Sequence, residues 1–245
     1  MIEACGRTDK GPVRMTNEDS FASEKDLSLF VVADGLGGHV AGDVASRIAV
    51  ETMVGFIRRT HQVKEFTWPC GLDLSQSHAA NRLRTGVQLA NERLFRTSRG
   101  RTDLQGMGTT VVSALITGSR LVMAHVGDSR LYSLAGGVLR RLTRDDSWHE
   151  HAGDAETHAL TNALGIQQRT QVSVREHDLV DNEILLFCTD GLHGVVDDSN
   201  LAQLMRQEEE LSALSEQLVS AALAAGTRDN VTALLVRYQG HGVTH

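Results

Sequence analysis

Residues 109–143 read TTVVSALITGSRLVMAHVGDSRLYSLAGGVLRRLT and contain four short apolar runs in succession. Glycine-containing pairs at 118–119, 127–128 and 136–137 separate the runs, and such pairs are typical of hairpin turns. Runs of this length that end at glycine are typical of strands. The segment therefore predicts four consecutive strands that pair antiparallel through tight turns.

The rest of the chain surrounds this block with helices and further strands. Ser75 or Ser77 is a candidate N-cap for the second helical stretch. A doubly wound parallel sheet would alternate single strands with single helices, whereas this chain groups them in blocks. Mostly antiparallel sheets with helices packed outside are therefore predicted. The other expected strands are 2–7, 27–33, 170–179, 183–189 and 231–238, and the expected helices are 42–60, 75–98, 200–207 and 211–225.

Composition excludes several classes of protein. The 245 residues carry 24 basic and 31 acidic side chains, and a net charge of −7 argues against nucleic acid as a partner. No run approaches the roughly 18 apolar residues of a membrane span, so no membrane association is expected. The three cysteines, Cys5, Cys70 and Cys188, lie far apart and outside any CxxC motif. We therefore expect a reducing, cytoplasmic location.

Carboxylates recur where predicted strands end or turn. Asp and Gly commonly form turns, which is the simplest interpretation of any one of them. Asp34 and Asp190, however, each follow an apolar strand and precede a glycine, and a buried charge there is costly unless it is paired or bound to a metal. Ligand sets made only of oxygen suit Mg²⁺ or Mn²⁺. The carboxylate positions are Glu18–Asp19, Asp34, Asp128, Asp190 and Asp229.

Eight segments in this order resemble the bacterial metal-dependent protein phosphatases of type 2C (the PPM family). They span residues 11–236 and are GPVRMTNEDS, VVADGLGGHVAGDVAS, GMGTTVVSALI, HVGDSRLY, LTRDDS, LTNALG, LLFCTDGLHGVV and GTRDNVTALLV. The resemblance implies an α+β fold, a four-layer αββα sandwich of two mostly antiparallel sheets flanked by helices. It also implies one catalytic domain over residues 1–240, with a short flap around 144–160 and a tail at 241–245.

The resemblance implies a role for most of these carboxylates. Asp34 matches the carboxylate that bridges two core metal ions, and the carbonyl of Gly35 matches a further ligand of one ion. Asp190 and Asp229 match the ligands of the other ion. The cofactors implied are two Mn²⁺ or Mg²⁺ ions, and the resemblance extends to a third.

Further residues match the family's supporting positions. Glu18 and Asp19 match a pair that acts mainly through metal-bound waters, and Asp128 matches a residue that joins Asp190 at the third ion. Arg14 matches the arginine that grips the substrate phosphate, a task that suits a planar guanidinium. The reaction implied is hydrolysis of phosphoserine or phosphothreonine in proteins by a water that bridges the two cations.

The sequence departs from the family pattern around the site. Eukaryotic members carry a histidine proton donor directly after the DG pair, where this chain has Leu36. His39 is then a candidate donor, with a role in fixing the glycine-rich turn and donation by a metal-bound water as alternatives. The short flap, read as a solvated or substrate-facing loop, predicts a more open site. Its three histidines match no standard zinc spacing and are His149, His151 and His158.

The sequence therefore predicts a phosphoprotein phosphatase whose partners are phosphorylated proteins, including a Ser/Thr kinase or its targets. Compact chains of this kind resemble phosphatases paired with a kinase in proteobacterial signalling, including control of type VI secretion. A non-catalytic pseudophosphatase that binds phosphoproteins is one alternative. A hydrolase of other phosphoesters is another.

Overall fold

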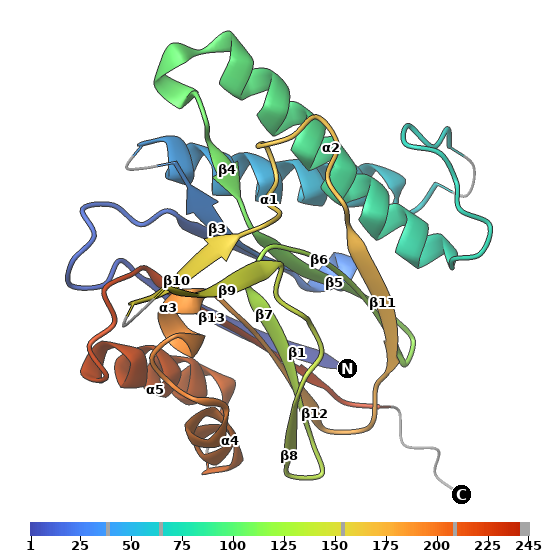
Figure 1. The fold of residues 1–245 in the computed structure, drawn as a ribbon. Coiled ribbons are helices and arrows are strands. Elements are labelled where there is room, and N and C mark those ends of the chain that lie inside the picture. The colour runs from blue at the N-terminus through green and yellow to red at the C-terminus, as the bar shows by residue number, and fades with distance from the viewer. Residues whose placement is uncertain (38–39, 64–65, 153–154, 208–209, 241–245) are drawn as a thin grey trace, which may run out of the picture.

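The computed structural model describes residues 1–37, 40–63, 66–152, 155–207 and 210–240, with the backbone alone at 40, 148–152 and 155–159. Two antiparallel sheets lie face to face at the centre, and helices cover the outer face of each (Figure 1). This arrangement confirms the predicted α+β fold, a four-layer αββα sandwich. No helix within the described ranges has the length and apolar character needed to cross a bilayer.

The first sheet has the strand order β1-β13-β12-β7-β8, and every neighbouring pair is antiparallel. Helix α5 packs against β1 and β13, and α3 and α4 lie beside it. The strands are β1 (Ile2–Asp9), β7 (Arg130–Ala135), β8 (Val138–Arg141), β12 (Glu183–Cys188) and β13 (Val231–Tyr238). The helices are α3 (Asp190–His193), α4 (Asp198–Gln207) and α5 (Leu211–Ala224).

The second sheet has the order β11-β6-β5-β3-β2, and the short strand β4 also pairs with β3. Helices α1 and α2 pack against each other and cover its outer face (Figure 1). The strands are β2 (Asp19–Glu24), β3 (Leu29–Leu36), β4 (Gly108–Thr109), β5 (Val111–Thr117), β6 (Arg120–Val126) and β11 (Ser173–Asp178). The helices are α1 (Val40–Thr60), α2 (His78–Gly100) and the 3₁₀ turns Lys25–Leu27 and Thr102–Leu104.

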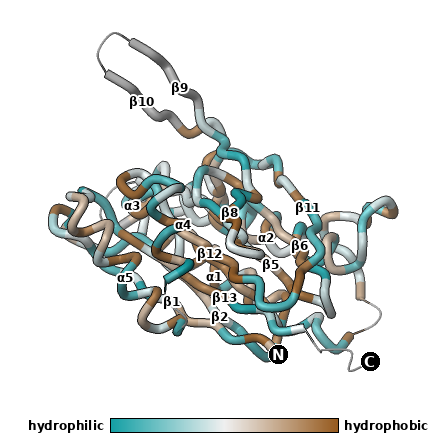
Figure 2. Tube along the Cα trace, turned by 90° about the horizontal axis from the view of Figure 1, so that it is seen from below, coloured by the Kyte–Doolittle hydropathy of each residue, from teal (hydrophilic) through white to brown (hydrophobic). Residues whose placement is uncertain are grey.

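Three apolar cores hold the four layers together. The middle core lies between the sheets, where Phe30 of β3 meets Phe187 of β12 with ring centroids 6.3 Å apart. A second core joins α1 and α2 to one sheet, and a third joins α3–α5 to the other. Hydrophobic residues follow the strands through the middle of the molecule (Figure 2). Both faces of β3 and β12 are covered, which explains why these strands read as continuous apolar runs.

Most predicted elements are confirmed within a few residues. The block at 109–143 forms four strands that pair in sequence order, except that β6 and β7 lie in different sheets. Ser77 caps α2, because its Oγ accepts a hydrogen bond from the Ala80 amide at 3.1 Å. The alternative cap, Ser75, instead donates its hydroxyl to Asp73 in the preceding loop.

Two local expectations were wrong, and one strand was missed. The flap is not a loop, because β9 (Ser147–Ala152) and β10 (Ala155–Leu160) pair as an antiparallel hairpin. Strand β2 was not predicted from its polar sequence DSFASE, although it pairs fully with β3. Asp34 does not end its strand, since β3 continues to Leu36 through pairing with β4.

Candidate metal centre

Asp34 is held through its backbone at the edge between β3 and β5. Its amide donates to the Thr110 hydroxyl at 3.0 Å, while its carbonyl accepts from the Thr110 amide at 2.9 Å and the Thr109 hydroxyl at 2.7 Å. These bonds fix the backbone of Asp34 and do not involve its carboxylate. Burial raises the pKa of that carboxyl well above its ordinary value, and the charges of Asp19 and Asp190 raise it further.

Asp19 lies directly opposite Asp34 on the neighbouring strand β2. One carboxylate oxygen, Oδ2, accepts hydrogen bonds from the hydroxyls of Thr189 at 2.9 Å and Thr232 at 2.6 Å. The other oxygen, Oδ1, is buried and has no hydrogen-bond partner in the part of the chain that the structure describes. Burial raises the pKa of Asp19 to about 7. An oriented, desolvated and unpaired oxygen of this kind suits a cation.

Asp190 approaches the same space from the other sheet. It follows β12 directly and begins α3, so the end of a buried strand points its carboxylate toward the cluster. Its Oδ1 is also buried without a hydrogen-bond partner among the described residues. Burial raises the pKa of Asp190, and the charge of Asp229 adds to the effect. The prediction that Asp190 follows a buried strand is confirmed, since all six residues of β12 are buried.

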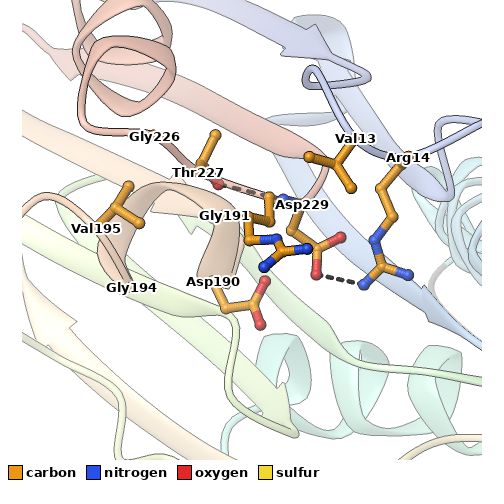
Figure 3. Close-up of a pocket in the computed structure, with 10 residues that line it drawn as sticks. Val13, Arg14, Asp190, Gly191, Gly194, Val195, Gly226, Thr227 and Asp229 are labelled. Carbon is orange, nitrogen blue, oxygen red and sulfur yellow. Dashed lines mark hydrogen bonds and ion pairs between the residues drawn. The ribbon is translucent and has the colours of Figure 1, made fainter.

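Arg14 and Asp229 complete the rim. Their side chains form an ion pair with 2.5 Å between Nη2 and Oδ2, and about half of the Arg14 side chain is exposed. The hydrogen bond to Asp229 raises the pKa of Arg14. In Figure 3 the Arg14 guanidinium and the carboxylates of Asp190 and Asp229 face a common space. This space is a pocket of about 570 Å³, with Val195 and Gly226 on the side away from Arg14.

Asn230 is a positioning residue that the sequence analysis missed. Its Oδ1 accepts the Glu18 amide at 2.8 Å, and its Nδ2 donates to the carbonyls of Lys10 at 2.8 Å and Thr16 at 2.9 Å. The side chain therefore closes the loop that carries Arg14 onto the start of β13. Its position beside Asp229 in GTRDNVT was the available signal, since a buried amide next to a site carboxylate needs several partners.

Glycines allow Glu18 and the start of α1 to approach the site. The Gly35 amide donates to the Glu18 carbonyl at 3.1 Å, and Glu18 itself is buried. A Cβ on Gly42 would overlap the Glu18 carboxylate, and one on Gly35 would overlap the Gly42 carbonyl. A side chain at Gly35 would require the backbone to move, and one at Gly42 would require the Glu18 side chain to leave its position. The Gly35 carbonyl, predicted as a ligand, thus belongs to a closely packed strand–helix junction.

Asp128 lies in the turn between β6 and β7, next to this cluster. Burial raises its pKa to about 7, and the charge of Asp190 contributes in the same direction. Its carbonyl accepts a hydrogen bond from His193 Nε2 at 3.1 Å, which places the proton on Nε2. Burial lowers the pKa of His193 to about 4, so the ring is neutral at pH 7. His193 therefore supports the Asp128 turn.

The donor set fits a hard divalent cation. Burial disfavours the ionised forms of Asp19, Asp34 and Asp190, and the charge of nearby Asp229 adds to the effect on each of them. Within the described ranges, no three acidic, histidine or cysteine side chains already enclose one point as a finished ligand shell. Mg²⁺ and ions like it keep several waters and need few carboxylates. The chemistry of the residues therefore fits a hydrated ion.

Four candidate residues lie wholly or in their side chains outside the described part of the structure. His39, the candidate proton donor, falls at the undescribed residues 38–39. The side chains of the flap histidines are likewise outside the described part, although their backbone belongs to β9 and β10. The roles of His39 and of the flap histidines stay predictions. The flap histidines are His149, His151 and His158.

A four-layer αββα sandwich with a carboxylate cluster at one end of its two sheets defines a metal-dependent phosphatase. Residues 13–235 match the family described as "Protein phosphatase 2C", which covers most of the chain. The chain belongs to this family, whose members hydrolyse phosphoserine and phosphothreonine in proteins with Mn²⁺ or Mg²⁺.

Named relatives and solved structures agree with this assignment. The serine/threonine phosphatase stp of Listeria monocytogenes is 34% identical, over 94% of this chain and 93% of that protein. The phosphatase PstP/Ppp of Mycobacterium tuberculosis has a crystal structure with a TM-score of 0.82 and 28% identity, covering 98% of this chain and 99% of that one. PppA, described as a key regulatory component of T6SS in Pseudomonas aeruginosa, has a TM-score of 0.80 and 31% identity, covering 97% and 98%.

A further structure bears on the metal content. The catalytic domain of PstP has been solved in complex with two manganese ions, and it matches this chain with a TM-score of 0.80 and 29% identity. The match covers 96% of this chain and 97% of that one. The two ions belong to that structure.

Proposed function

We propose that Asp34, Asp190 and Asp229 hold the two divalent cations of this phosphatase, with the Gly35 carbonyl as a further ligand. Glu18 and Asp19 support them through water, and Asp128 joins Asp190 at a third ion. The observation that carries this assignment is the pair of buried carboxylate oxygens, Asp19 Oδ1 and Asp190 Oδ1, that lack hydrogen-bond partners among the described residues. A buried acceptor without a donor requires a compensating positive charge or proton.

The chain's own residues bind and orient the substrate. When bound, divalent cations supply positive charge to the phosphoryl group and lower the pKa of a coordinated water. Arg14 supplies a planar guanidinium, which can donate two parallel hydrogen bonds to phosphate oxygens. Because Arg14 is half-exposed at the pocket rim, a substrate phosphate can compete with Asp229 for it.

Other side chains hold this machinery in place. Thr189 and Thr232 fix the direction of the Asp19 carboxylate, and Asn230 fixes the loop that carries Arg14. Supporting hydrogen bonds of this kind orient the groups that contact metal and substrate. His39 is proposed as a proton donor to the leaving alkoxide. Its place directly after the sequence DGLGG, within a segment that resembles the family's, supports that role.

We also propose the setting in which the enzyme works. Its substrates are phosphorylated proteins, and we infer that it reverses a Ser/Thr kinase in the cytoplasm. Three free cysteines, one of them buried in β12, support a reducing compartment. Residues 1–240 act as one catalytic domain in this proposal, with residues 241–245 as a tail.

The test is phosphate release from a phosphothreonine peptide, with and without Mn²⁺ or Mg²⁺. The native chain is compared with Asp190→Asn, which keeps the shape of the side chain and removes its charge. Asp103→Asn serves as the control, because Asp103 is exposed and pairs only with the neighbouring Arg101 in the described structure. Metal-dependent turnover that collapses in Asp190→Asn alone supports the assignment. Equal turnover in Asp190→Asn would contradict it, and no turnover of the native chain with either metal would favour the pseudophosphatase.

A further inference from the structure

A second pocket of about 320 Å³ lies beside the metal centre, on the side of α3, α4 and α5. Its apolar lining consists of Val195, Val196, Leu204, Ala221 and Ala225. Asn200 and Gln203 also line it, and no charged residue of the described chain does. A pocket of this kind has no group that would bind a phosphate or a metal ion.

The apolar pocket and the candidate site share their walls. Val195 lines both pockets, and it is 38% exposed although it is apolar. On the other side, Ala225 lines the apolar pocket while the next residue, Gly226, lines the metal-centre pocket. Figure 3 shows Val195 and Gly226 on the same side of that pocket. The two hollows are therefore neighbours along one surface.

Short backbone hydrogen bonds connect these walls to the metal-centre carboxylates. After Asp190, the Gly194 amide donates to the Asp190 carbonyl at 2.7 Å and the Val196 amide to the Leu192 carbonyl at 3.0 Å. The position of Val195 is thus tied to the position of Asp190.

The other wall of the apolar pocket, formed by Ala221 and Ala225, is connected to Asp229 in the same way. The Ala225 amide donates to the Ala221 carbonyl at 2.9 Å, and the Thr227 amide to the Ala222 carbonyl at 3.1 Å. The Thr227 hydroxyl then accepts the Asp229 amide at 3.3 Å. Because both walls continue into the site, a group seated in the apolar pocket has a set position relative to the reacting phosphate.

We propose that this pocket selects substrates by receiving an apolar side chain of the phosphoprotein, close in sequence to the phosphorylated residue. The proposal rests on the proposed function, since the phosphate must sit at Arg14 for the neighbouring side chain to reach the pocket. Its lining favours leucine-sized aliphatic groups and rejects charged ones, because an ion buried there would have no partner. Continuity with the phosphate site favours this occupant over a second copy of the chain.

The first experiment measures kcat/KM for a set of phosphothreonine peptides in an alanine background. A single leucine is placed in turn at each position within about four residues of the phosphothreonine, and lysine and aspartate are tested at the same positions. We expect leucine at one or two positions to raise kcat/KM about tenfold over alanine, a typical effect of filling an apolar pocket. Lysine and aspartate at those positions should give no gain.

A pair of variants locates the effect in the pocket. Ala225→Leu fills it from the exposed end of α5, whereas Ala224→Leu adds the same group at the neighbouring exposed residue, which does not line it. The quantity compared is the ratio of kcat/KM for the leucine peptide to that for the alanine peptide. Ala225→Leu should bring this ratio to about one, and Ala224→Leu should leave it at the native value. Because each ratio is taken within one protein, a general loss of activity cancels.

The outcomes separate this proposal from the proposed function. If all peptides are hydrolysed but leucine gives no advantage at any position, the proposal is overturned and the phosphatase assignment stands. It is also overturned if Ala225→Leu keeps the full leucine advantage. A flat peptide series, together with a dimer that Ala225→Leu dissociates in analytical ultracentrifugation, would assign the pocket to contacts between chains. No turnover of any peptide, or of an aryl phosphate, would reject the proposed function itself.

Discussion

Asp19 shows how single residues set the chemistry of this site. Thr189, which follows β12, and Thr232 of β13 donate hydrogen bonds to one of its oxygens, although Asp19 belongs to the second sheet. The Thr232 hydroxyl also contacts Thr8 at 2.8 Å, so the chain of hydroxyl groups extends to β1. The carboxylate is thereby turned so that its second oxygen faces the cluster. Such orientation is created by residues that do not themselves touch the substrate.

Asn230 should matter for both stability and substrate binding. Asn230→Ala removes three hydrogen bonds and leaves buried groups unpaired, which we expect to cost about 2 to 4 kcal/mol of the free energy of unfolding. The loosened Arg14 loop should raise KM for a phosphopeptide about tenfold. Urea unfolding and steady-state kinetics test both effects. Asn230→Asp keeps the acceptor oxygen, so its stability should lie between those of the native chain and Asn230→Ala. If Asn230→Ala were as stable as the native chain, these hydrogen bonds would be dispensable.

His125 should make the protein sensitive to acid. Its ring is buried, neither nitrogen has a hydrogen-bond partner among the described residues, and burial lowers its pKa. The unfolded chain then binds a proton more readily than the folded one, so stability present above pH about 6.5 falls as the pH is lowered. His125→Leu should reduce that fall, measured as the difference in urea midpoint between native and variant from pH 8 to pH 5. A constant difference across this range would contradict the prediction.

At the scale of elements, the sequence predicts the strands whose side chains are buried on both faces. It misses the polar strands that form only by hydrogen bonding to a neighbouring strand. Strands β3, β12 and β13 can be predicted from their continuous apolar sequence, because both of their faces are buried. β2 is polar, and its strand state comes from pairing with β3 rather than from its own pattern. The same holds for β9 and β10, whose sequences SWHEHA and AETHAL carry no apolar alternation. Pairing of this sort depends on a partner strand that local sequence does not reveal.

In the metal centre, too, some residues could be predicted from the sequence and others could not. The carboxylates could be predicted because glycine and apolar strands mark them in the sequence, and the resemblance assigned their roles. The supporting residues Thr189 and Thr232 could not, because their partners lie 43 to 224 residues away along the chain. For Asn230, whose partners lie 212 to 220 residues away, the only signal was its place beside Asp229. Polar residues inside common motifs acquire such roles only once the two sheets meet.

The start of α2 gives a test at this scale. Ser77→Ala removes the hydroxyl that accepts the Ala80 amide, and loss of an N-cap costs about 1 kcal/mol of stability. Ser77 is remote from the metal centre in the sequence and lines none of its pocket, so turnover should be unchanged. Ser220→Ala, at an exposed site on α5, is the matched control. The thermal midpoint of Ser77→Ala should be lower than that of Ser220→Ala. Equal midpoints would mean that Ser77 does not cap the helix in solution.

At the scale of the whole molecule, the carboxylate cluster lies where the two sheets meet. Asp19 and Asp34 belong to the second sheet, whereas Asp190 and Asp229 flank strands β12 and β13 of the first. Burial and the neighbouring like charges raise the pKa of Asp19, Asp34 and Asp190, so the ionised carboxylates oppose the contact between the sheets. The middle apolar core has to offset this repulsion. The charge of the cluster therefore couples the function of the site to the stability of the sandwich.

A divalent cation should accordingly stabilise the folded protein, independently of any activity. A ligand that binds only the native state raises its stability by RT ln(1 + [L]/Kd), about 2.7 kcal/mol at a hundredfold excess over Kd. We expect Mn²⁺ to raise the thermal midpoint of the chelator-treated native chain, and EDTA to reverse the rise. Asp190→Asn should lose most of this response because it removes charge from the cluster, while Asp103→Asn should keep it.

The metal-free Asp190→Asn variant should also unfold at a higher temperature than the metal-free native chain, since one repelling charge is gone. A lower midpoint for that variant without metal would show that repulsion at this junction does not limit the stability of the fold.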